Sequence, residues 1–353
     1  YAFKGCDFSN DGANVVKITD ITPPNVDTVN CSKVNLSNYN LNKLKKFKIK
    51  SGDYIIAMTG ATIGKLGKVS SGEAYLNQRV AKFCPTGINK QYLYYVLSTN
   101  RFNSFIMNNI DSSSAQPNIS SSSIGRYTFD CHDEDSQLHI VNILGSIDDK
   151  IENNEKMIKQ FETLNRLYFH KNYILADKKD WKIELLGNCV DITRGSSPRP
   201  IQDYLGNKGM PWVKISDATE NDSNYLTKTK EFIKEDGINL SKTVIPNTLI
   251  VSNSATPGLP KIMKITACVH DGWLIFTNYK DLTKEFVKYV IDFNKKELIS
   301  SGNGSVFTNL KTEILKALKI YLPPKNILEQ MNNYLKANLD IQYKLECNNI
   351  KLQ

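Results

Sequence analysis

The sequence predicts an α+β protein in which two similar domains are each followed by a long helix. Three observations lead to this architecture. Segments of the first half recur in the second half, heptad patterns follow each copy, and short β-branched runs alternate with helical stretches inside each copy.

Three segments of the first half return later in the same order. The pairs are residues 15–20 with 212–217, 52–64 with 246–258, and 114–119 with 305–310, at separations of 197, 194 and 191 residues. One short match arises by chance, but three collinear ones indicate a duplicated domain. Val213 lies 32 residues after Trp181 and Val16 only 15 residues after Tyr1, so we expect about 17 residues of the first domain to precede Tyr1.

Within each copy the pattern mixes strands and helices. Short β-branched and aromatic runs predict strands at residues 54–58, 80–83, 248–251 and 273–277. Longer amphipathic stretches predict helices at residues 90–107 and 282–299. We therefore expect a twisted, partly barrel-like sheet edged by helices in each domain.

A heptad pattern follows each domain and predicts coiled-coil helices. The first pattern repeats Ile140, Ile147, Asn154, Phe161 and Tyr168, interleaved with Leu144, Ile151, Ile158 and Asn165. The second repeats Ile327, Tyr334, Ile341 and Asn348, interleaved with Met331, Asn338, Leu345 and Leu352. Asparagines on such a seam can fix the register of a helix pair. The alternative is an ordinary amphipathic helix that packs on its own domain.

These patterns divide the chain into four parts. The expected boundaries are a first domain at residues 1–133, a helix at 134–176, a second domain at 177–325 and a helix at 326–353. The polar stretch at residues 177–180 serves as the linker before the second copy begins.

Composition narrows the class of protein. The chain is 41% hydrophobic and 23% charged, as in soluble globular proteins, and has no run of 18 apolar residues that would predict a membrane span. Its seven cysteines are scattered without a C-x-x-C pair, which argues for a reducing cytoplasm and against zinc. A metal at Cys131, His132 and His139 would need a fourth ligand from elsewhere. The net charge of +9 is compatible with a polyanionic partner.

The stretch Gly60-Ala61-Thr62-Ile63-Gly64-Lys65 resembles a phosphate-binding loop but differs from it in two ways. Three residues rather than four separate the glycines, and Leu66 stands where a Ser or Thr would hold Mg²⁺. The sequence therefore argues against an ATPase. In the second copy Gly60 and Lys65 are both lost, which indicates a variable loop on a scaffold, as in recognition surfaces.

Several segments together resemble the specificity subunit of type I restriction-modification systems. They are the strand and turn at residues 51–69, Asn77-Gln78, Tyr92-Leu93-Tyr94-Tyr95, residues 116–119 and the helix start near Ser136-Gln137. The resemblance covers nearly the whole chain. In the second copy His270-Asp271 replaces Asn77-Gln78.

The resemblance implies two target recognition domains, each reading one half of a split double-stranded DNA sequence. It implies that the two helices pair antiparallel, as a spacer and as the docking surface for two methyltransferase subunits. Those partners would bind S-adenosylmethionine and methylate adenine, and a translocating, cleaving restriction subunit could join them. This chain itself would hold no cofactor.

Hydroxyl, amide and cationic side chains near the glycine turn are candidates for DNA contacts, because such groups pair with base edges and phosphates. In the first domain these positions are Thr59, Gly60, Ala61, Thr62, Lys65, Asn77, Gln78 and Arg79. In the second domain they are Arg194, Arg199, Ser252, Asn253, Ser254, Thr256 and Lys261. An Asn-Gln pair at a strand start can also be a simple solvated edge.

No catalytic residues are predicted. A DNA methyltransferase needs an Asn/Asp-Pro-Pro-Tyr/Phe tetrad and a glycine-rich cofactor loop, and neither occurs in the sequence. Two rival interpretations remain. The chain could be the DNA-recognition portion of a larger fused restriction-methyltransferase enzyme, or a coiled-coil scaffold without affinity for DNA.

Overall fold

The computed structural model describes residues 1–111, 116–300 and 309–353. It contains two compact units, Tyr1–Asp149 and Lys150–Gln353, which we call unit 1 and unit 2. Part of the third repeated segment, at residues 114–115 and 305–308, lies outside the described residues.

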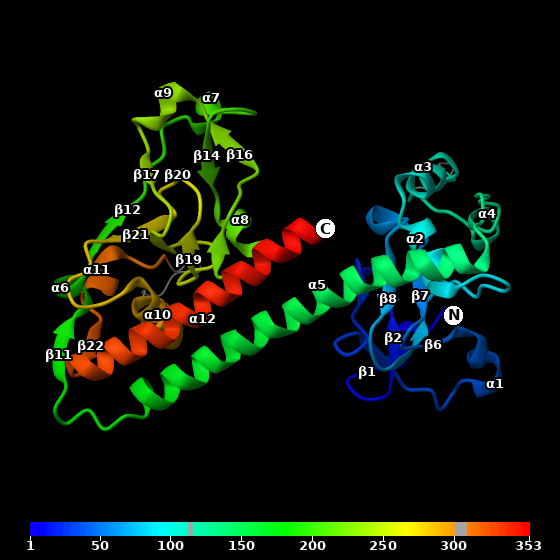
Figure 1. Cartoon of the computed structure of the whole chain (residues 1–353), viewed down its shortest axis with the longest axis horizontal. Coiled ribbons are helices and arrows are strands. Elements are labelled where there is room, and N and C mark those ends of the chain that lie inside the picture. The colour runs from blue at the N-terminus through cyan, green and yellow to red at the C-terminus, as the bar shows by residue number, and fades with distance from the viewer. Residues whose placement is uncertain (112–115, 301–308) are drawn as a thin grey trace. The chain divides into compact units, whose positions relative to one another are not determined.

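Unit 1 contains two five-stranded sheets instead of the single sheet expected from the sequence (Figure 1). The first has the order β1-β5-β2-β9-β6, formed by β1 (Phe8–Ser9), β2 (Ala13–Val16), β5 (Ser32–Val34), β6 (Lys48–Lys50) and β9 (Glu73–Leu76). The second has the order β10-β7-β8-β4-β3, formed by β3 (Ile21–Thr22), β4 (Asn25–Val26), β7 (Tyr54–Ala57), β8 (Leu66–Val69) and β10 (Val80–Lys82). Single-sequence patterns locate strands but do not say which strands pair.

Short helices complete unit 1: α1 (Leu41–Leu44), α2 (Lys90–Leu97), α3 (Asn100–Asn108) and α4 (Ser121–Ile124). The single helix expected at 90–107 is broken at Ser98-Thr99, where Thr99 caps α3 by accepting a hydrogen bond from Phe102 N. Threonine favours this N-cap position over a helix interior. Phe102 and Ile106 of α3 pack on Ile56 of β7, so these helices cover one face of the second sheet.

Unit 2 repeats the two sheets of unit 1, but the sheet with the glycine turn differs in its two edge strands. One sheet has the order β12-β21-β18-β19-β15, formed by β12 (Asp191–Arg194), β15 (Tyr225–Leu226), β18 (Leu249–Ser252), β19 (Pro260–Met263) and β21 (Trp273–Thr277). The other has the order β13-β16-β14-β20-β17, formed by β13 (Leu205–Gly206), β14 (Met210–Val213), β16 (Glu231–Ile233), β17 (Lys242–Val244) and β20 (Ala267–Val269).

The strand pairing confirms the duplication. In unit 1, β2 runs parallel to β9 and β4 parallel to β8; in unit 2, β14 runs parallel to β20 and β15 parallel to β19. A further two-stranded sheet joins β11 (Lys182–Leu185) to β22 (Lys319–Leu322). The remaining helices before the C-terminal one are α6 (Leu186–Cys189), α7 (Ile201–Tyr204), α8 (Ile215–Thr219), α9 (Glu235–Ile238), α10 (Lys284–Ser300) and α11 (Thr312–Lys316).

The ungapped alignment of the glycine-turn repeat is wrong by one residue at its strand. Ala57 N bonds to Lys65 O, and Ser252 N bonds to Leu259 O in the same way, so Ala57 corresponds to Ser252 rather than to Val251. Gly52 and Asn247, which become equivalent, both have left-handed backbones with φ of 83° and 69°. The turn of unit 2 is therefore one residue shorter, which an ungapped comparison cannot detect.

The two long helices pair antiparallel within unit 2, as expected. They are α5 (Glu134–Phe169), which begins in unit 1, and α12 (Lys325–Leu352) (Figure 1). Asn154 bonds to Asn349 at 2.7 Å and Asn338 to Asn165 at 2.8 Å, so the partner number falls as the α5 number rises.

Both seam asparagines of α5, Asn154 and Asn165, are fully buried. The partner of Asn154 is Asn349, one residue after the predicted seam position Asn348. The predicted seam of α12 is wrong by one residue, because the buried positions recur every seven residues at Leu328, Leu335, Gln342 and Asn349, whereas Ile341 is 37% exposed. A turn at His170–Ile174 ends the first long helix.

No helix in the described residues is long and apolar enough to cross a membrane. In the same part of the chain, no three or more His, Cys, Asp or Glu side chains are grouped to hold a metal ion.

Candidate functional site

The glycine turn of unit 1 follows β7 and is hydrogen-bonded to residues 117–119. Thr59 Oγ1 and Gly60 N both donate to Pro117 O at 3.0 Å, and Ile119 N donates to Met58 O at 2.9 Å. Gly60 and Gly64 have φ of 71° and 80°, a left-handed conformation that glycine adopts without strain. The turn is therefore fixed by backbone bonds and by the Thr59 hydroxyl, and Thr62 Oγ1 donates to Thr59 O within it at 3.4 Å.

A cleft of about 520 Å³ lies beside this turn. It is lined by Lys17, Ile18, Thr19, Thr59, Asn77, Gln78, Arg79, Gln116 and Asn118. The structure thus brings together four of the eight candidates of unit 1. Gly60, Ala61 and Thr62 form the turn next to Thr59, whereas Lys65 lines a different cleft, with Tyr94 and Asn103.

Sequence reasoning did not assign Lys17 and Thr19 to this site. The signal was present, because they belong to the repeated segment at residues 15–20. In both copies this segment begins a helical turn: Lys17 N donates to Asp20 Oδ2 at 2.7 Å, and Lys214 N donates to Asp217 Oδ2 at 2.8 Å. The repeated aspartate caps that turn and so positions the preceding lysine at the cleft.

Arg79 occupies an uncommon backbone conformation at the edge of the cleft. Its φ is 68°, which L-residues other than Asn and Asp rarely adopt. Its guanidinium donates to Asn118 Oδ1 at 3.0 Å. Backbone strain of this kind clusters at functional sites, where the surrounding structure holds it in place.

Unit 2 carries a carboxylate where unit 1 has an amide. Asp271 corresponds to Gln78 and accepts a hydrogen bond from Ser197 Oγ at 3.0 Å. Two guanidinium groups also approach it, Arg199 at 3.2 Å and Arg194 at 3.6 Å. Partial burial raises the pKa of Asp271, but the Ser197 hydrogen bond and the two arginine charges outweigh it and hold this pKa below its ordinary value.

His270 replaces Asn77 and is neutralised by its surroundings. Burial lowers the pKa of this imidazole, more than the nearby Asp271 charge raises it. Gly272 N lies 2.7 Å from Nδ1, which fixes Nδ1 as the acceptor and leaves the proton on Nε2. The structure therefore gathers Arg194 and Arg199 around Asp271, next to a neutral histidine.

The other candidates of unit 2 are mostly internal. Ser252 is fully buried, and its hydroxyl bonds to Thr256 O and Leu259 N within the turn. Asn253 is 5% exposed, and its side-chain amide donates to Asp271 O at 2.9 Å. Ser254 and Thr256 remain partly exposed on the turn. These bonds hold the shortened turn in shape.

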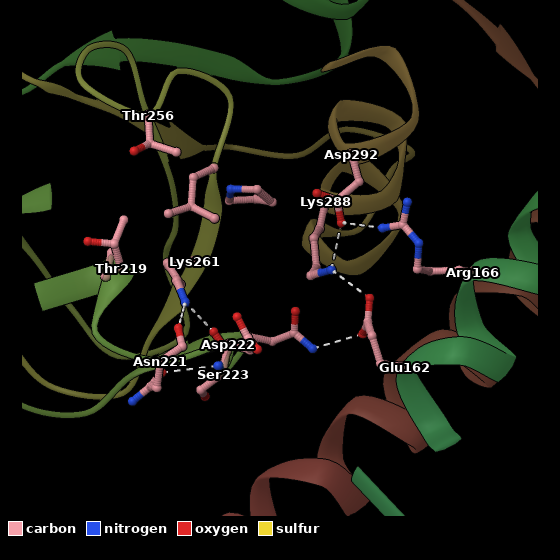
Figure 2. Close-up of a pocket in the computed structure, with 14 residues that line it drawn as sticks. Glu162, Arg166, Thr219, Asn221, Asp222, Ser223, Thr256, Lys261, Lys288 and Asp292 are labelled. Carbon is pink, nitrogen blue, oxygen red and sulfur yellow. Dashed lines mark hydrogen bonds and ion pairs between the residues drawn. The ribbon is translucent and has the colours of Figure 1, made fainter. Parts of the chain in front are cut away.

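Lys261 is only 2% exposed and points away from the turn surface. Figure 2 shows its ammonium directed at the carbonyl groups of Asn221 and Ser223, and the bond to Asn221 O is 3.3 Å long. Burial lowers the pKa of this ammonium to about 8. It lines a cleft of about 310 Å³ on the side of unit 2 that faces α5 and α10.

Charged side chains around the buried Lys288 form the other wall of that cleft. Lys288 of α10 is 1% exposed and lies 2.8 Å from Asp292 and 3.7 Å from Glu162 of α5. Arg166 approaches Asp292 at 3.8 Å (Figure 2). Burial raises the pKa of Glu162, but Lys288 and a hydrogen bond from Asn224 outweigh it and hold this pKa below its ordinary value. Because these charged groups form ion pairs with one another, we interpret the cleft as a structural contact between α5 and α10.

The cleft of unit 1 and the Asp271 cluster of unit 2 thus present hydroxyl, amide, carboxylate and cationic groups, the kinds of group that contact base edges and phosphates. The chain is similar in sequence to specificity subunits of type I restriction enzymes. The type I restriction enzyme MjaIX specificity subunit of Methanocaldococcus jannaschii is 22% identical over 305 residues, or 79% of this chain and 69% of that protein. The putative type I restriction enzyme MjaX specificity subunit of the same organism is 25% identical over 215 residues, or 57% and 48%.

A solved structure of an S subunit also resembles this chain. The crystal structure of the type I restriction-modification system S subunit from M. genitalium matches with a TM-score of 0.58 at 13% identity, covering 98% of this chain and 91% of that one, so the two share a fold. The sequence model of the type I restriction modification DNA specificity domain matches residues 6–163 and again 178–351. This double match over most of its length shows that the chain belongs to the family of type I restriction-modification DNA specificity proteins, which are non-catalytic DNA-recognition subunits.

Proposed function

We propose that this chain reads a bipartite DNA target, with one half-site contacted by each unit. The observation that carries the proposal is the repeated strand order, which places a turn of different chemistry at the same position of each unit. Two copies of one scaffold with different side chains at the same turn suit two half-sites of different sequence. The candidates at residues 59–62, with Lys65, Asn77, Gln78 and Arg79, serve the first half-site.

In unit 2 we assign the contact to the cluster around Asp271. Carboxylates accept hydrogen bonds from the amino group of cytosine, and arginine donates to guanine or to phosphate. Asp271 with Arg194 and Arg199 offers both kinds of group on a partly exposed surface. Ser252, Asn253 and Lys261 act behind this surface, since their polar atoms are engaged inside the unit.

The helix pair serves as a spacer between the two half-sites and as the docking surface for two methyltransferase subunits. Leu164 and Leu167 of α5 and Ile350 of α12 are 48%, 61% and 64% exposed, and apolar side chains of this size on a helix pair are suited to burial by a partner. The partners would supply S-adenosylmethionine and transfer its methyl group to adenine. A restriction and translocation subunit could join this cytoplasmic complex.

The alternative is that the same two units form the DNA-recognition portion of a longer, fused restriction-methyltransferase. The duplicated architecture serves both equally. The length of the intact gene product separates them, since a separate subunit adds a few tens of residues and a fused enzyme adds several hundred.

Methylome sequencing of the host strain tests the proposal. The intact strain should carry methylated adenines in one split sequence motif, and a strain that lacks this gene should lose that motif. Restoring the gene with Asp271→Asn should change the bases required in one half of the motif only. A methylation pattern that is the same with and without the gene would overturn the proposal.

A further inference from the structure

A second polar cleft adjoins the candidate site of unit 1. It measures about 550 Å³, lies over β1 and β5, and shares Lys17 with the first cleft. Of the described residues that line the two clefts, none is an aspartate or a glutamate. Lys17, Lys33 and Arg79 supply positive charge along them, with asparagines and serines between. The two clefts together therefore carry the positive charge that favours binding of a phosphate backbone.

The ammonium of Lys17 is held in place without being neutralised. It lies 4.2 Å from the centre of the Phe8 ring, a cation–π contact that orients the charge. In the described part of the chain, no carboxylate oxygen is within ion-pair distance of this ammonium. The nearby Asp20 carboxylate instead accepts a hydrogen bond from the backbone N–H of Lys17. The full charge of Lys17 therefore faces the junction of the two clefts.

The equivalent lysine of unit 2 is neutralised. Val15 pairs with Ser32 across β2 and β5, and Trp212 pairs with Glu231 across β14 and β16, so Ser32 and Glu231 occupy the same place. Lys214, which corresponds to Lys17, forms an ion pair with Glu231 at 2.5 Å. One difference between the copies, serine against glutamate, thus decides whether this lysine carries a free charge.

We propose that Lys17 contacts a DNA phosphate and extends the DNA interface of unit 1 over β1 and β5. The inference rests on the function proposed for the first cleft and assigns to this site the DNA backbone beside the bases. An ammonium is a compact point charge without the planar fork of arginine, so it positions the duplex and adds no base preference. Unit 2 makes no such contact through Lys214.

The test changes the charge at Ser32 in the full chain, purified with its methyltransferase partners. Ser32→Glu copies unit 2 and should neutralise Lys17, whereas Ser32→Gln has the same size without the charge and is the matched control. Affinity for target and for unrelated DNA is measured over a range of salt concentrations. Ser32→Glu should lower the salt slope by about one and weaken both affinities several-fold, because one phosphate contact is lost.

Lys17→Gln provides an independent variant in case Ser32→Glu does not fold, which thermal melting would reveal. It should reproduce the loss of slope and leave the methylated sequence motif unchanged. A slope equal to that of the unchanged chain in Lys17→Gln, or equal effects of Glu and Gln at Ser32, would overturn the inference. If instead the unchanged complex shows no sequence preference, the proposed function fails, while the slopes on unrelated DNA still decide the role of Lys17.

Discussion

The two units share a backbone and differ in the charge that they place on it. Met58 N bonds to Arg79 O and Asn253 N bonds to Gly272 O, both at 2.8 Å, so the same ladder holds both turns. Beside this backbone hydrogen bond, unit 1 has an amide and a cationic side chain, Gln78 and Arg79. Unit 2 carries Asp271 and a glycine. Because main-chain bonds fix the turn, the side chains that face outward can change without loss of the fold.

A second difference lies behind the turn. At Gly67 of unit 1, an added Cβ would lie 2.7 Å from Val26 Cγ2, so β8 packs closely on its neighbour. The equivalent position of unit 2 is Lys261, which reaches into the loop before β15. That loop is bound to both long helices through Asn224, whose amide donates to Glu162 and to Gln342 at 2.9 Å. Unit 2 therefore joins its turn to the helix pair by buried polar contacts.

The largest expected effect comes from removing the buried charge at Lys288. Lys288→Met leaves Glu162 and Asp292 without the ammonium that balances them, which should cost unit 2 about 3–5 kcal/mol of stability. All three tryptophans, Trp181, Trp212 and Trp273, belong to unit 2, so tryptophan fluorescence in urea follows this unit selectively.

The matched control for this measurement is Lys156→Met on the exposed face of α5. Its ion pair with Glu152 is solvated on both sides, with side chains 63% and 42% exposed. Such a change should stay within about 0.5 kcal/mol. Equal losses for the two variants would contradict the claim that buried charge supports unit 2.

The next largest effect is on base discrimination. Changing amide to carboxylate or carboxylate to amide at the equivalent positions, by Gln78→Asp in unit 1 or Asp271→Asn in unit 2, should alter the preferred base at one position of one half-site by roughly 1–3 kcal/mol. Asp271→Asn should also raise affinity for unrelated DNA, because Arg194 and Arg199 lose their acidic neighbour. Competition binding with single-base variants of the target measures both effects. A preference that shifts in both half-sites together would contradict separate reading by the two units.

The sequence predicted the duplicated α+β architecture and the two long heptad helices because both depend on patterns that recur along the chain, whereas the antiparallel pairing of the helices was implied by the family resemblance. The repeated Val-Lys-Ile-Thr/Ser-Asp segment and the seam residues Asn154 and Asn165 were visible in this way. The sequence also indicated Thr59, Asn77, Gln78 and Arg79 as candidates, because their side chains suit DNA contacts, and the structure brings these four together at one cleft.

Other features depend on contacts between distant residues. Glu231 neutralises Lys214 from another strand, and no local pattern links residues 17 positions apart in this way. The sequence alone predicts that Lys261 is an exposed cation, but the loop before β15 covers it. The single-residue deletion in the turn of unit 2 became visible only through the hydrogen bonds of Ala57 and Ser252.

A smaller effect should appear in the pH dependence of stability. The pKa of Lys261 is about 8 in the folded protein and near 10.5 when solvated, so above pH 8 the unfolded chain holds a proton that the folded chain has lost. Raising the pH through this window therefore favours the folded state. The free energy of unfolding of unit 2 should rise by about 1 kcal/mol between pH 8 and 9 relative to that of Lys261→Met. Parallel pH profiles of the two proteins would show that the ammonium is not desolvated.

The smallest effect separates backbone strain from side-chain function at Arg79. The left-handed φ of 68° costs a non-glycine residue about 1 kcal/mol, and part of this is offset by the greater freedom of glycine in the unfolded chain. Arg79→Gly should therefore be more stable than Arg79→Ala by about 0.5 kcal/mol. Both variants should weaken DNA binding equally, since both lose the guanidinium.

Hydrogen exchange of peptides from β7 and β10 reports this difference, because unit 1 contains no tryptophan. Arg101 in α3 provides the control, where the helical backbone should reverse the order and favour alanine over glycine. If alanine were as stable as glycine at position 79, the left-handed backbone would carry no strain. If glycine is the more stable, unit 1 retains a strained residue because its guanidinium is used.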